Sequence, residues 1–203
     1  MTSIIKNPGD SPVRYSEDHK AGTHKRIVEE ASQRFRRDGI GATGLQPLMK
    51  ALGLTHGGFY AHFKSKDDLV EQALRAATED INPAARKAFR EPGGLPNFID
   101  LYLSSEHRAN PAQGCPLPTM SAELGQRGQP SATTDAFLTA RLAQLDEALP
   151  EDHHEHHAIG MFATLVGALM LSRSVEDPQL SERLLEGARS WLKHQIVSGE
   201  SQE

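Results

Sequence analysis

A run of histidines, HHEHH at 153–157, has the residue types and the spacing that could bind a metal ion. His153 with His156 or His157, and His154 with His157, are three or four residues apart, so they would share one face of a helix. Imidazole nitrogens placed in this way bind zinc or nickel. A helical metal enzyme is therefore one alternative, but no paired acid and base or nucleophile accompanies the run. We expect instead a solvated helix start, with no metal, no cofactor and no enzymatic activity.

The single cysteine, Cys115, is the second candidate for chemistry. The segment GCPLPTMSAEL predicts a loop and then a helix with Pro116 at its first position, which makes Cys115 the N-cap. A thiol at that place would have its pKa lowered by the helix dipole, and it would be reactive. The alternative is a small apolar residue in the core. Because one cysteine cannot form an intrachain disulfide, the count fits a reducing cytoplasm.

Charge is unevenly distributed along the 203-residue chain. The formal net charge is −5, yet residues 14–75 hold 11 Lys and Arg against 8 Asp and Glu, whereas the rest hold 11 against 19. Only the basic N-terminal part could face a phosphate backbone. The N-terminus has no apolar core with a cleavage site, and the longest apolar run, at 158–171, is too short for a membrane span. We expect a cytoplasmic protein without a membrane segment.

Apolar residues recur at helical spacing through nearly the whole chain, so the sequence predicts an all-α fold. Residues 1–18 are polar and contain Pro and Gly, and we expect a flexible arm. A first helix at 19–38 ends at Gly39, beyond which Ile40 can cover Phe35. A short second helix at about 45–52 takes Gly44 as its N-cap.

Two further helix starts carry capping signals. Thr55 can cap a third helix, with Leu54 and Phe59 at the two positions of a hydrophobic staple. Ser65 and Asp68 form the capping pattern of a fourth helix. Two short helices joined by a tight turn and packed on a longer one make a helix-turn-helix, which is a DNA-binding motif.

The stretch FRRDGIGATGLQPLMKALGLTHGGFYAHFKSKDDLVEQAL closely resembles the N-terminal domain of the TetR/AcrR family of bacterial one-component repressors. The shared features are F-x-x-x-G at the end of the first helix, A-x-x-x-G-[LV]-[ST] in the turn, [LF]-Y-x-H-F in the third helix and K-x-x-L at the start of the fourth. The resemblance spans roughly residues 24–75, about a quarter of the chain.

This resemblance implies that the third helix enters the major groove of double-stranded DNA at a palindromic operator. The residues at the family's phosphate-binding places are Tyr60, His62 and Lys66, and Thr55 is a further candidate. The places that read bases are held by Gln46, His56, Gly57 and Gly58. The family more often has Thr, Ser or Ala in place of the second glycine, so we expect few direct base contacts. Arg14 could add a minor-groove contact from the arm.

The resemblance also implies a helical C-terminal domain that binds a small-molecule inducer and forms a homodimer. Helices at 155–173 and 178–197 would pair across a two-fold axis in a four-helix interface. The candidates for the ligand pocket are Phe98, Tyr102, Cys115, Met120, Phe137, Met161 and Phe162. The G-C segment at 114–115 further resembles a subset of TetR-like regulators that includes electrophile- and oxidant-responsive ones.

The sequence thus predicts an arm at 1–18, a helix-turn-helix domain at 19–65, a linking helix at 66–80 and a ligand-binding and dimerisation domain at 81–203. Pro83 and later Pro and Gly clusters are expected to divide this last domain into helices. The predicted function is that of a repressor released from its operator by a small molecule. A thiol sensor based on Cys115 is the alternative on the same scaffold, and an activator would make the same DNA contacts.

Overall fold

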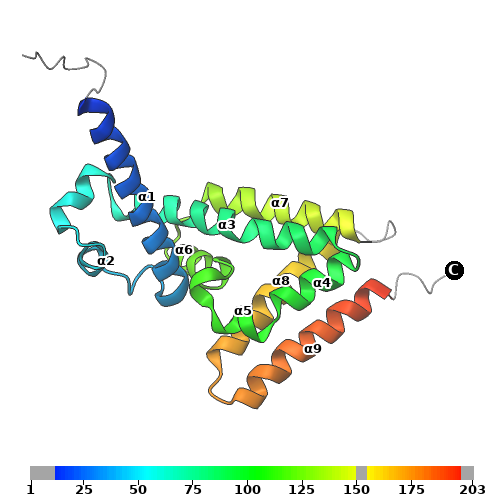
Figure 1. Ribbon diagram of the computed structural model, residues 1–203. Helices are drawn as coiled ribbons and strands as arrows, with labels where there is room; N and C mark the ends of the chain where they lie inside the picture. Colours follow the sequence, from blue (N-terminus) through cyan, green and yellow to red (C-terminus); the bar gives the residue numbers. More distant parts are fainter. Residues whose placement is uncertain (1–11, 150–154, 198–203) are drawn as a thin grey trace, which may run out of the picture.

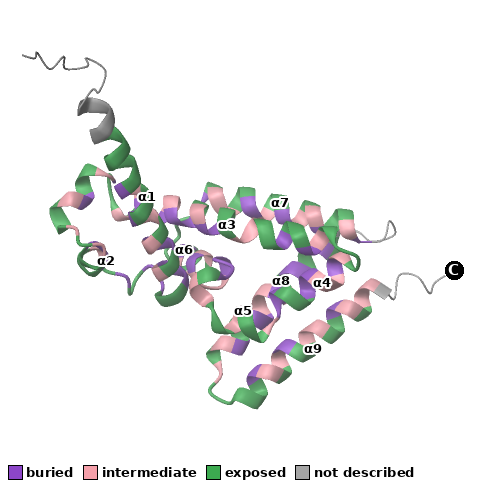
Figure 2. Cartoon of the chain, viewed as in Figure 1, coloured by how far each residue is buried: buried purple, intermediate pink, exposed green. Residues whose placement is uncertain are grey.

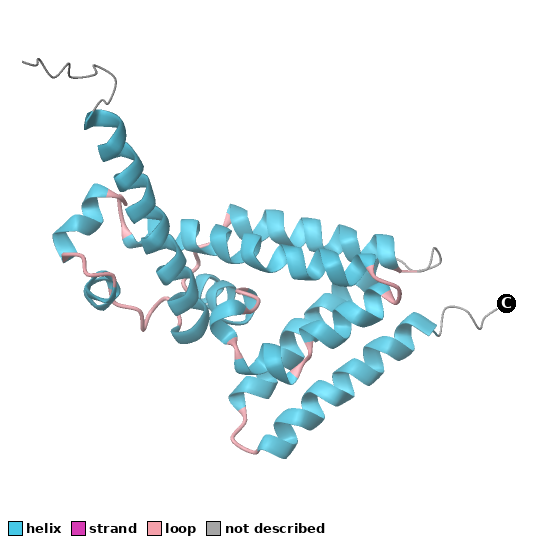
Figure 3. Ribbon diagram, in the orientation of Figure 1, coloured by secondary structure: helices cyan, strands magenta, loops and turns pink. Residues whose placement is uncertain are grey.

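Every regular element that the structure describes is a helix (Figure 3). The computed structural model describes residues 12–149 and 155–197, and the predicted all-α fold is confirmed within them. The first part comprises α1 (Pro12–Asp38), α2 (Leu45–Ala51), the 3-10 helix η1 (His56–Ala61) and α3 (Lys66–Arg90). The remainder comprises α4 (Gly94–Tyr102), α5 (Ser105–Ala109), the 3-10 turn η2 (Pro111–Gln113), the π-helical turn η3 (Leu117–Ser121), α6 (Ala122–Gln126), α7 (Ala132–Ala148), α8 (Glu155–Ser174) and α9 (Pro178–Val197).

α3 joins two parts of the molecule (Figure 1). On one side, α1, α2 and η1 form a small lobe, and on the other lie α4, α8 and α9, with α7 running beside α3. α6 packs near the end of α1, so the second part of the chain reaches back to the small lobe.

The end of α1 is built as the sequence predicts. Gly39 has a φ of +91°, a left-handed conformation that favours glycine, and its N–H donates to the carbonyl of Phe35 at 3.1 Å. Phe35 and Ile40 are both fully buried. Gly44 is the N-cap of α2, also as predicted.

The caps of the next two elements are confirmed as well. The Thr55 hydroxyl accepts a hydrogen bond from the N–H of Gly58 at 3.2 Å, and the Ser65 hydroxyl accepts one from the N–H of Asp68 at 3.1 Å. Leu54 packs on the core that contains Phe59, where the staple was expected. These local bonds fix the turn between α2 and η1 and the start of α3.

α1 begins at Pro12, so residues 12–18 are helical and the expected arm is wrong for them. Proline suits the first turn of a helix, because the N–H that it lacks has no partner there in any case. Residues 1–11 lie outside the described part of the chain.

Pro83 does not end a helix, contrary to the expectation, because α3 continues through it to Arg90. Its missing N–H removes one backbone hydrogen bond, to the carbonyl at 79. Buried alanines on both sides, Ala77, Ala85 and Ala88, keep α3 packed against its neighbours, and this tertiary packing overrides the local signal.

The element in the recognition position is a 3-10 helix, whereas an ordinary α-helix was expected. Its bonds join residues three apart, as from the N–H of Gly58 to the carbonyl of Thr55 (3.1 Å). Gly57 and Gly58 each lower α-helix propensity by about 1 kcal/mol relative to Ala, which explains the tighter turn.

Two hydrophobic cores hold the chain together, and buried faces point toward the interior of each part (Figure 2). The core of the small lobe is built on Ile27, Phe35, Phe59 and Leu74, and it includes Met120 from η3 and Leu124 from α6. The second core lies among α4, α7, α8 and α9. Because η3 and α6 contribute to the first core, a displacement of either element would also displace residues of the small lobe.

Candidate DNA interface and ligand cavity

η1 presents its aromatic residues in two directions. Phe59 is fully buried and stacks on Phe63 with ring centroids 5.2 Å apart. Tyr60 is 62% exposed, and its ring meets the edges of Phe59 (5.2 Å) and His56 (6.0 Å). The Tyr60 hydroxyl is therefore at the surface, on a ring that packs against the buried Phe59, and a phosphate oxygen could reach it. Gln46, Thr55 and His56 are also exposed.

The two glycines of η1 are not required by the fold. Neither has a positive φ. A Cβ at Gly57 would meet nothing within 4 Å, and one at Gly58 would meet the Thr55 hydroxyl at 3.4 Å, an ordinary contact. The free protein thus has room for alanine at both places. A side chain at Gly57 would instead point toward whatever approaches η1 from outside.

His62 is half-buried against His24 and Phe63. Burial, followed by the nearby His24 and Lys20, lowers its pKa, which favours the neutral imidazole at pH 7. Its Nδ1 is buried and has no hydrogen-bond partner within the described ranges. A neutral ring keeps one N–H, and this can still be donated to a phosphate.

Lys66, another predicted phosphate contact, has partners inside the protein. Its Nζ donates to the carbonyl of Ile40 at 2.6 Å and to that of Thr43 at 2.7 Å. Burial is the main cause that lowers the pKa of Lys66. The ammonium therefore ties the start of α3 to the segment between α1 and α2, and one of its three protons is left over for another acceptor.

Glu123 of α6 holds the same segment from the other side. Its two carboxylate oxygens accept hydrogen bonds from the backbone N–H groups of Ile40 (2.9 Å) and Gly41 (2.8 Å). Arg127 donates to the second oxygen at 3.0 Å. The loop that precedes α2 is thus held between Glu123 of α6 and Lys66 at the start of α3.

Arg36 makes a second link between the two parts. Its side chain is 2% exposed, and burial lowers its pKa. Its guanidinium donates to the carbonyl of Gly114 at 3.3 Å and to the carboxylate of Asp80 at 3.1 Å. A residue of α1 is therefore bonded to the loop before Cys115 and to α3.

A cavity of about 280 Å³ lies between α3, α4, the 104–115 segment and α7. It brings together four of the predicted pocket residues, Phe98, Tyr102, Cys115 and Phe137. The other three predicted pocket residues do not line this cavity. Met120 is fully buried in the core of the small lobe, Met161 lines a smaller cavity near Trp191, and Phe162 lies behind the rings of Tyr102 and Phe137. Asp80 and Gly114, the hydrogen-bond partners of Arg36, also line the cavity of about 280 Å³.

Of the two alternatives for Cys115, activation at a helix N-cap is wrong, and the small residue in the core is what the structure has. The residue is buried, and burial raises the pKa of its thiol instead of lowering it. The N-cap of the following turn is Pro116. The backbone N–H of Cys115 donates to His107 Nε2 at 3.0 Å, so it is not free to form an anion site. The thiol is a small buried group in the wall of the cavity.

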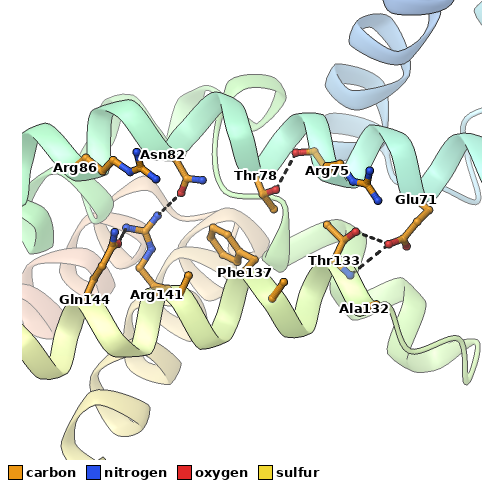
Figure 4. Close-up of a pocket in the computed structure, with 12 residues that line it drawn as sticks. Glu71, Arg75, Thr78, Asn82, Arg86, Ala132, Thr133, Phe137, Arg141 and Gln144 are labelled. Carbon is orange, nitrogen blue, oxygen red and sulfur yellow. Dashed lines mark hydrogen bonds between the residues drawn. The ribbon is translucent and has the colours of Figure 1, made fainter.

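A groove between α3 and α7 lies next to this cavity and shares Phe137 and Arg141 with it (Figure 4). At one end Glu71 of α3 accepts hydrogen bonds from the hydroxyls of Ser131 (2.7 Å) and Thr133. At the other end Arg141 donates to Asn82 (3.2 Å) and to Gln144 (2.8 Å). These bonds hold α7 along α3.

Only part of the histidine run can be located. His156 is exposed at the start of α8, as is His157, whereas His153 and His154 lie outside the described residues. In the ranges that are described, no group of three or more His, Cys, Asp or Glu side chains is placed to hold a metal ion.

A family model for bacterial regulatory proteins of the tetR family matches residues 27–73. The HTH-type transcriptional regulator TtgR of Pseudomonas putida is 30% identical over 175 residues, which cover 77% of this chain and 83% of TtgR. The chain belongs to the TetR family. The HTH-type transcriptional repressor Rv1474c of Mycobacterium tuberculosis is 27% identical over 179 residues, 82% of this chain and 90% of that protein.

Solved structures share the fold of this TetR-family chain. A TetR regulator from Legionella pneumophila has a TM-score of 0.71 at 19% identity, and reduced NemR from E. coli has 0.69 at 20%. Each match covers 86% of this chain and 97% of the other. The chain is accordingly a DNA-binding transcriptional regulator, of a family whose members are not enzymes. None of its described helices combines the length and the apolarity that crossing a bilayer requires.

Sequence reasoning missed the residues that connect the two parts of this TetR-family protein. Arg36 and Glu123 find their partners about 80 positions away, and nothing in the local pattern indicates such partners. Arg141 did leave a signal. It stands four residues after Phe137 and four before Leu145, on the buried stripe of α7, and an arginine in that register has to find a polar partner in the interior.

Proposed function

We propose that this TetR-family regulator is a homodimeric repressor that leaves a palindromic operator when a small molecule fills the cavity beside Cys115. One observation carries the proposal. Asp80 and Gly114 line the cavity, and both are hydrogen-bonded to Arg36 of α1. A ligand that displaces either wall residue changes the position of α1, on which α2 and η1 are packed. The two Glu123 bonds to the loop before α2 give a second route from α6.

In this proposal η1 enters the major groove, and its flanks bind phosphates. The DNA-contacting residues are Gln46, Thr55, His56, Gly57, Gly58, Tyr60, His62 and Lys66. The exposure of Gln46, Thr55, His56 and Tyr60 supports this assignment. The part up to residue 65 binds DNA, the start of α3 links, and the part from residue 81 binds the ligand and dimerises.

Exposed apolar side chains on α8 and α9 support a dimer. Ile159, Met170 and Leu171 of α8 are 44–48% exposed, and Trp191 of α9 is 51% exposed. A second copy of the chain would bury these faces in an interface that is the same on both subunits. Two copies of η1 would then lie about one turn of DNA apart, which a palindromic site requires.

The test begins with selection of DNA bound by the purified protein from a random pool. A palindrome with half-sites roughly 10 base pairs apart is expected. Reporter expression from the recovered site, with and without the regulator, then separates repression from activation. Recovery of a single, non-repeated half-site would overturn the dimeric proposal, and higher expression in the presence of the regulator would overturn the repressor.

A further inference from the structure

Arg141 is a charged residue that the protein only partly compensates. It is 3% exposed and lies over the rings of Phe98 (5.2 Å) and Phe137 (5.4 Å). Its polar partners are the neutral amides of Asn82 and Gln144, and no carboxylate of the described chain forms an ion pair with it. A buried guanidinium is costly unless an anion accompanies it. Among the described residues, the positive charge of Arg141 therefore has no negative charge beside it to balance it.

Arg141 lines both the cavity and the groove between α3 and α7. In the groove its guanidinium points toward Asn82 of α3 (Figure 4). Arg75 and Arg86 also line the groove and add positive charge. The carboxylates of Asp80 and Glu106 line the cavity, but both residues are exposed, and Asp80 already forms an ion pair with Arg36. The carboxylate of Glu71 is engaged by Ser131 and Thr133. An incoming anion would therefore meet a positive field beside Arg141.

Tyr102 supplies a second unsatisfied polar group in the same cavity. Its hydroxyl is buried and has no hydrogen-bond partner in the part of the chain that the structure describes. The nearby Cys115 thiol is at most a weak partner. A buried hydroxyl without a partner is unfavourable, so this group is available for a ligand atom.

The remaining lining sets the shape of the ligand. Phe98, Phe137, Ile81 and Ala85 supply apolar surface, and the volume of about 280 Å³ is near the lower limit of small-molecule sites, roughly 300 Å³. An aromatic ring would pack edge-on against the two phenylalanines, because the Arg141 guanidinium lies over both of their rings. This volume suits a molecule with one or two rings.

We infer that the cavity binds a small aromatic carboxylate, with its carboxylate on Arg141, its ring against Phe98 and Phe137, and a polar atom on the Tyr102 hydroxyl. Arginine suits this task because its planar fork matches the two oxygens of a carboxylate. The inference rests on the proposed function, since it names the class of inducer for that same cavity.

The test measures Kd by calorimetry for the full-length protein with three pairs of probes: benzoate, 4-hydroxybenzoate and 2-naphthoate, each beside its carboxamide. At least one carboxylate should bind about tenfold or more tightly than its carboxamide, since a charge-assisted hydrogen bond corresponds to that ratio. Equal affinities within each pair, or no binding of any carboxylate up to millimolar concentration, would overturn the inference.

Four variants locate the anion. Arg141→Gln should abolish the preference for the carboxylate, whereas Arg141→Lys should keep part of it. Tyr102→Phe removes a hydroxyl without an internal partner, so the protein should stay folded while the tightest probe binds about three- to tenfold more weakly. Arg75→Gln is the matched control, because Arg75 lines the groove but not the cavity. If Arg75→Gln alone removes the preference, the anion lies in the groove and the inference is wrong.

DNA release is measured separately, by anisotropy of a labelled selected operator. A carboxylate that binds with the expected preference but leaves the DNA complex intact would support the ligand class and contradict the ligand-responsive repressor. Release by a neutral molecule, with no carboxylate preference in calorimetry, would support the ligand-responsive repressor and contradict the ligand class.

Discussion

Glu123 of α6 accepts a 2.9 Å hydrogen bond from the backbone N–H of Ile40, in the loop that leads into α2. This bond joins α6 to the helix-turn-helix part of the chain, and it makes the position of the loop depend on where α6 lies. With the neighbouring bond to Gly41, it gives the first of five predictions.

Replacing Glu123 with alanine should reduce stability and uncouple the two parts. Two charge-assisted bonds are lost, a part-buried one from Ile40 and an exposed one from Gly41, so we expect the free energy of unfolding to fall by about 1–3 kcal/mol. DNA release by a ligand should weaken even where ligand binding is retained. Urea unfolding and operator anisotropy measure the two effects. Asp100→Asn, which breaks an exposed ion pair with Lys193, is the control and should change neither by much.

Gly57→Ala should leave the fold intact and damage DNA binding. Because a Cβ there meets nothing, the substitution should stabilise the free protein by about 0.5–1 kcal/mol. Operator affinity should drop at least tenfold if η1 approaches DNA as closely as we propose. Gly39→Ala is the contrast, since φ is +91° and the new Cβ would lie 2.1 Å from Glu123 Oε1, so thermal unfolding should show a marked loss. Unchanged operator affinity of Gly57→Ala would exclude close approach at this residue.

Lys66→Ala separates a phosphate contact from a purely structural role. A direct contact predicts weaker binding to all sequences and a decrease of about one in the slope of log affinity against log salt. Loss of the bonds to Ile40 and Thr43 alone predicts a lower unfolding temperature and weaker binding with the slope preserved. Tyr60→Phe is the companion variant, because the exposed hydroxyl has no part in the core. A slope equal to that of the wild type would remove Lys66 from the phosphate contacts.

Stability should fall at alkaline pH because of Cys115. Burial raises the pKa of its thiol in the folded protein above the ordinary value of about 8.5. The folded state therefore favours the neutral thiol. Its contribution is complete below the unfolded pKa and is lost as pH rises from there through the folded pKa, by at most about 1.4 kcal/mol per pH unit. Urea unfolding from neutral to alkaline pH should show a steeper decline for the wild type than for Cys115→Ala. Parallel curves would contradict the assignment.

Leu171→Glu should convert a dimer into a monomer. The side chain is 48% exposed on α8, and a charge there would be buried without a partner when two copies associate. Light scattering gives the mass, and operator affinity should fall with it. Ala140→Glu adds the same charge to the exposed side of α7 and should leave the dimer intact. A wild-type protein that is monomeric at all concentrations would reject the interface.

The features that could be predicted from sequence depend on interactions between residues that are close together in the chain. Gly39 ends α1, Thr55 caps η1 and Ser65 caps α3, because each acts on a backbone group within a few positions. Tyr60 was correctly expected at the surface, since Phe59 and Phe63 occupy the buried side of the same short element.

The features that could not be predicted depend on tertiary placement. The sequence places Lys66 at the start of α3, but its acceptors at Ile40 and Thr43 become neighbours only after the lobe has folded. For Cys115 the sequence left a reactive N-cap thiol and a small core residue as alternatives, and only the packing of α4 and α7 over the loop, which buries the thiol and raises its pKa, decides for the second.

The unbroken course of α3 through Pro83 makes it a lever arm. The helix has 25 residues and a length of about 37 Å, and the cavity touches it from Asp80 to Ala85, around the one place where a backbone bond is missing. The segment from there to Lys66 measures roughly 25 Å, so a tilt of roughly 10° would carry its tip about 4 Å. A tilt of this size would thus shift the start of α3, and with it the segment of Ile40 and Thr43 that Lys66 holds, by more than the length of a hydrogen bond.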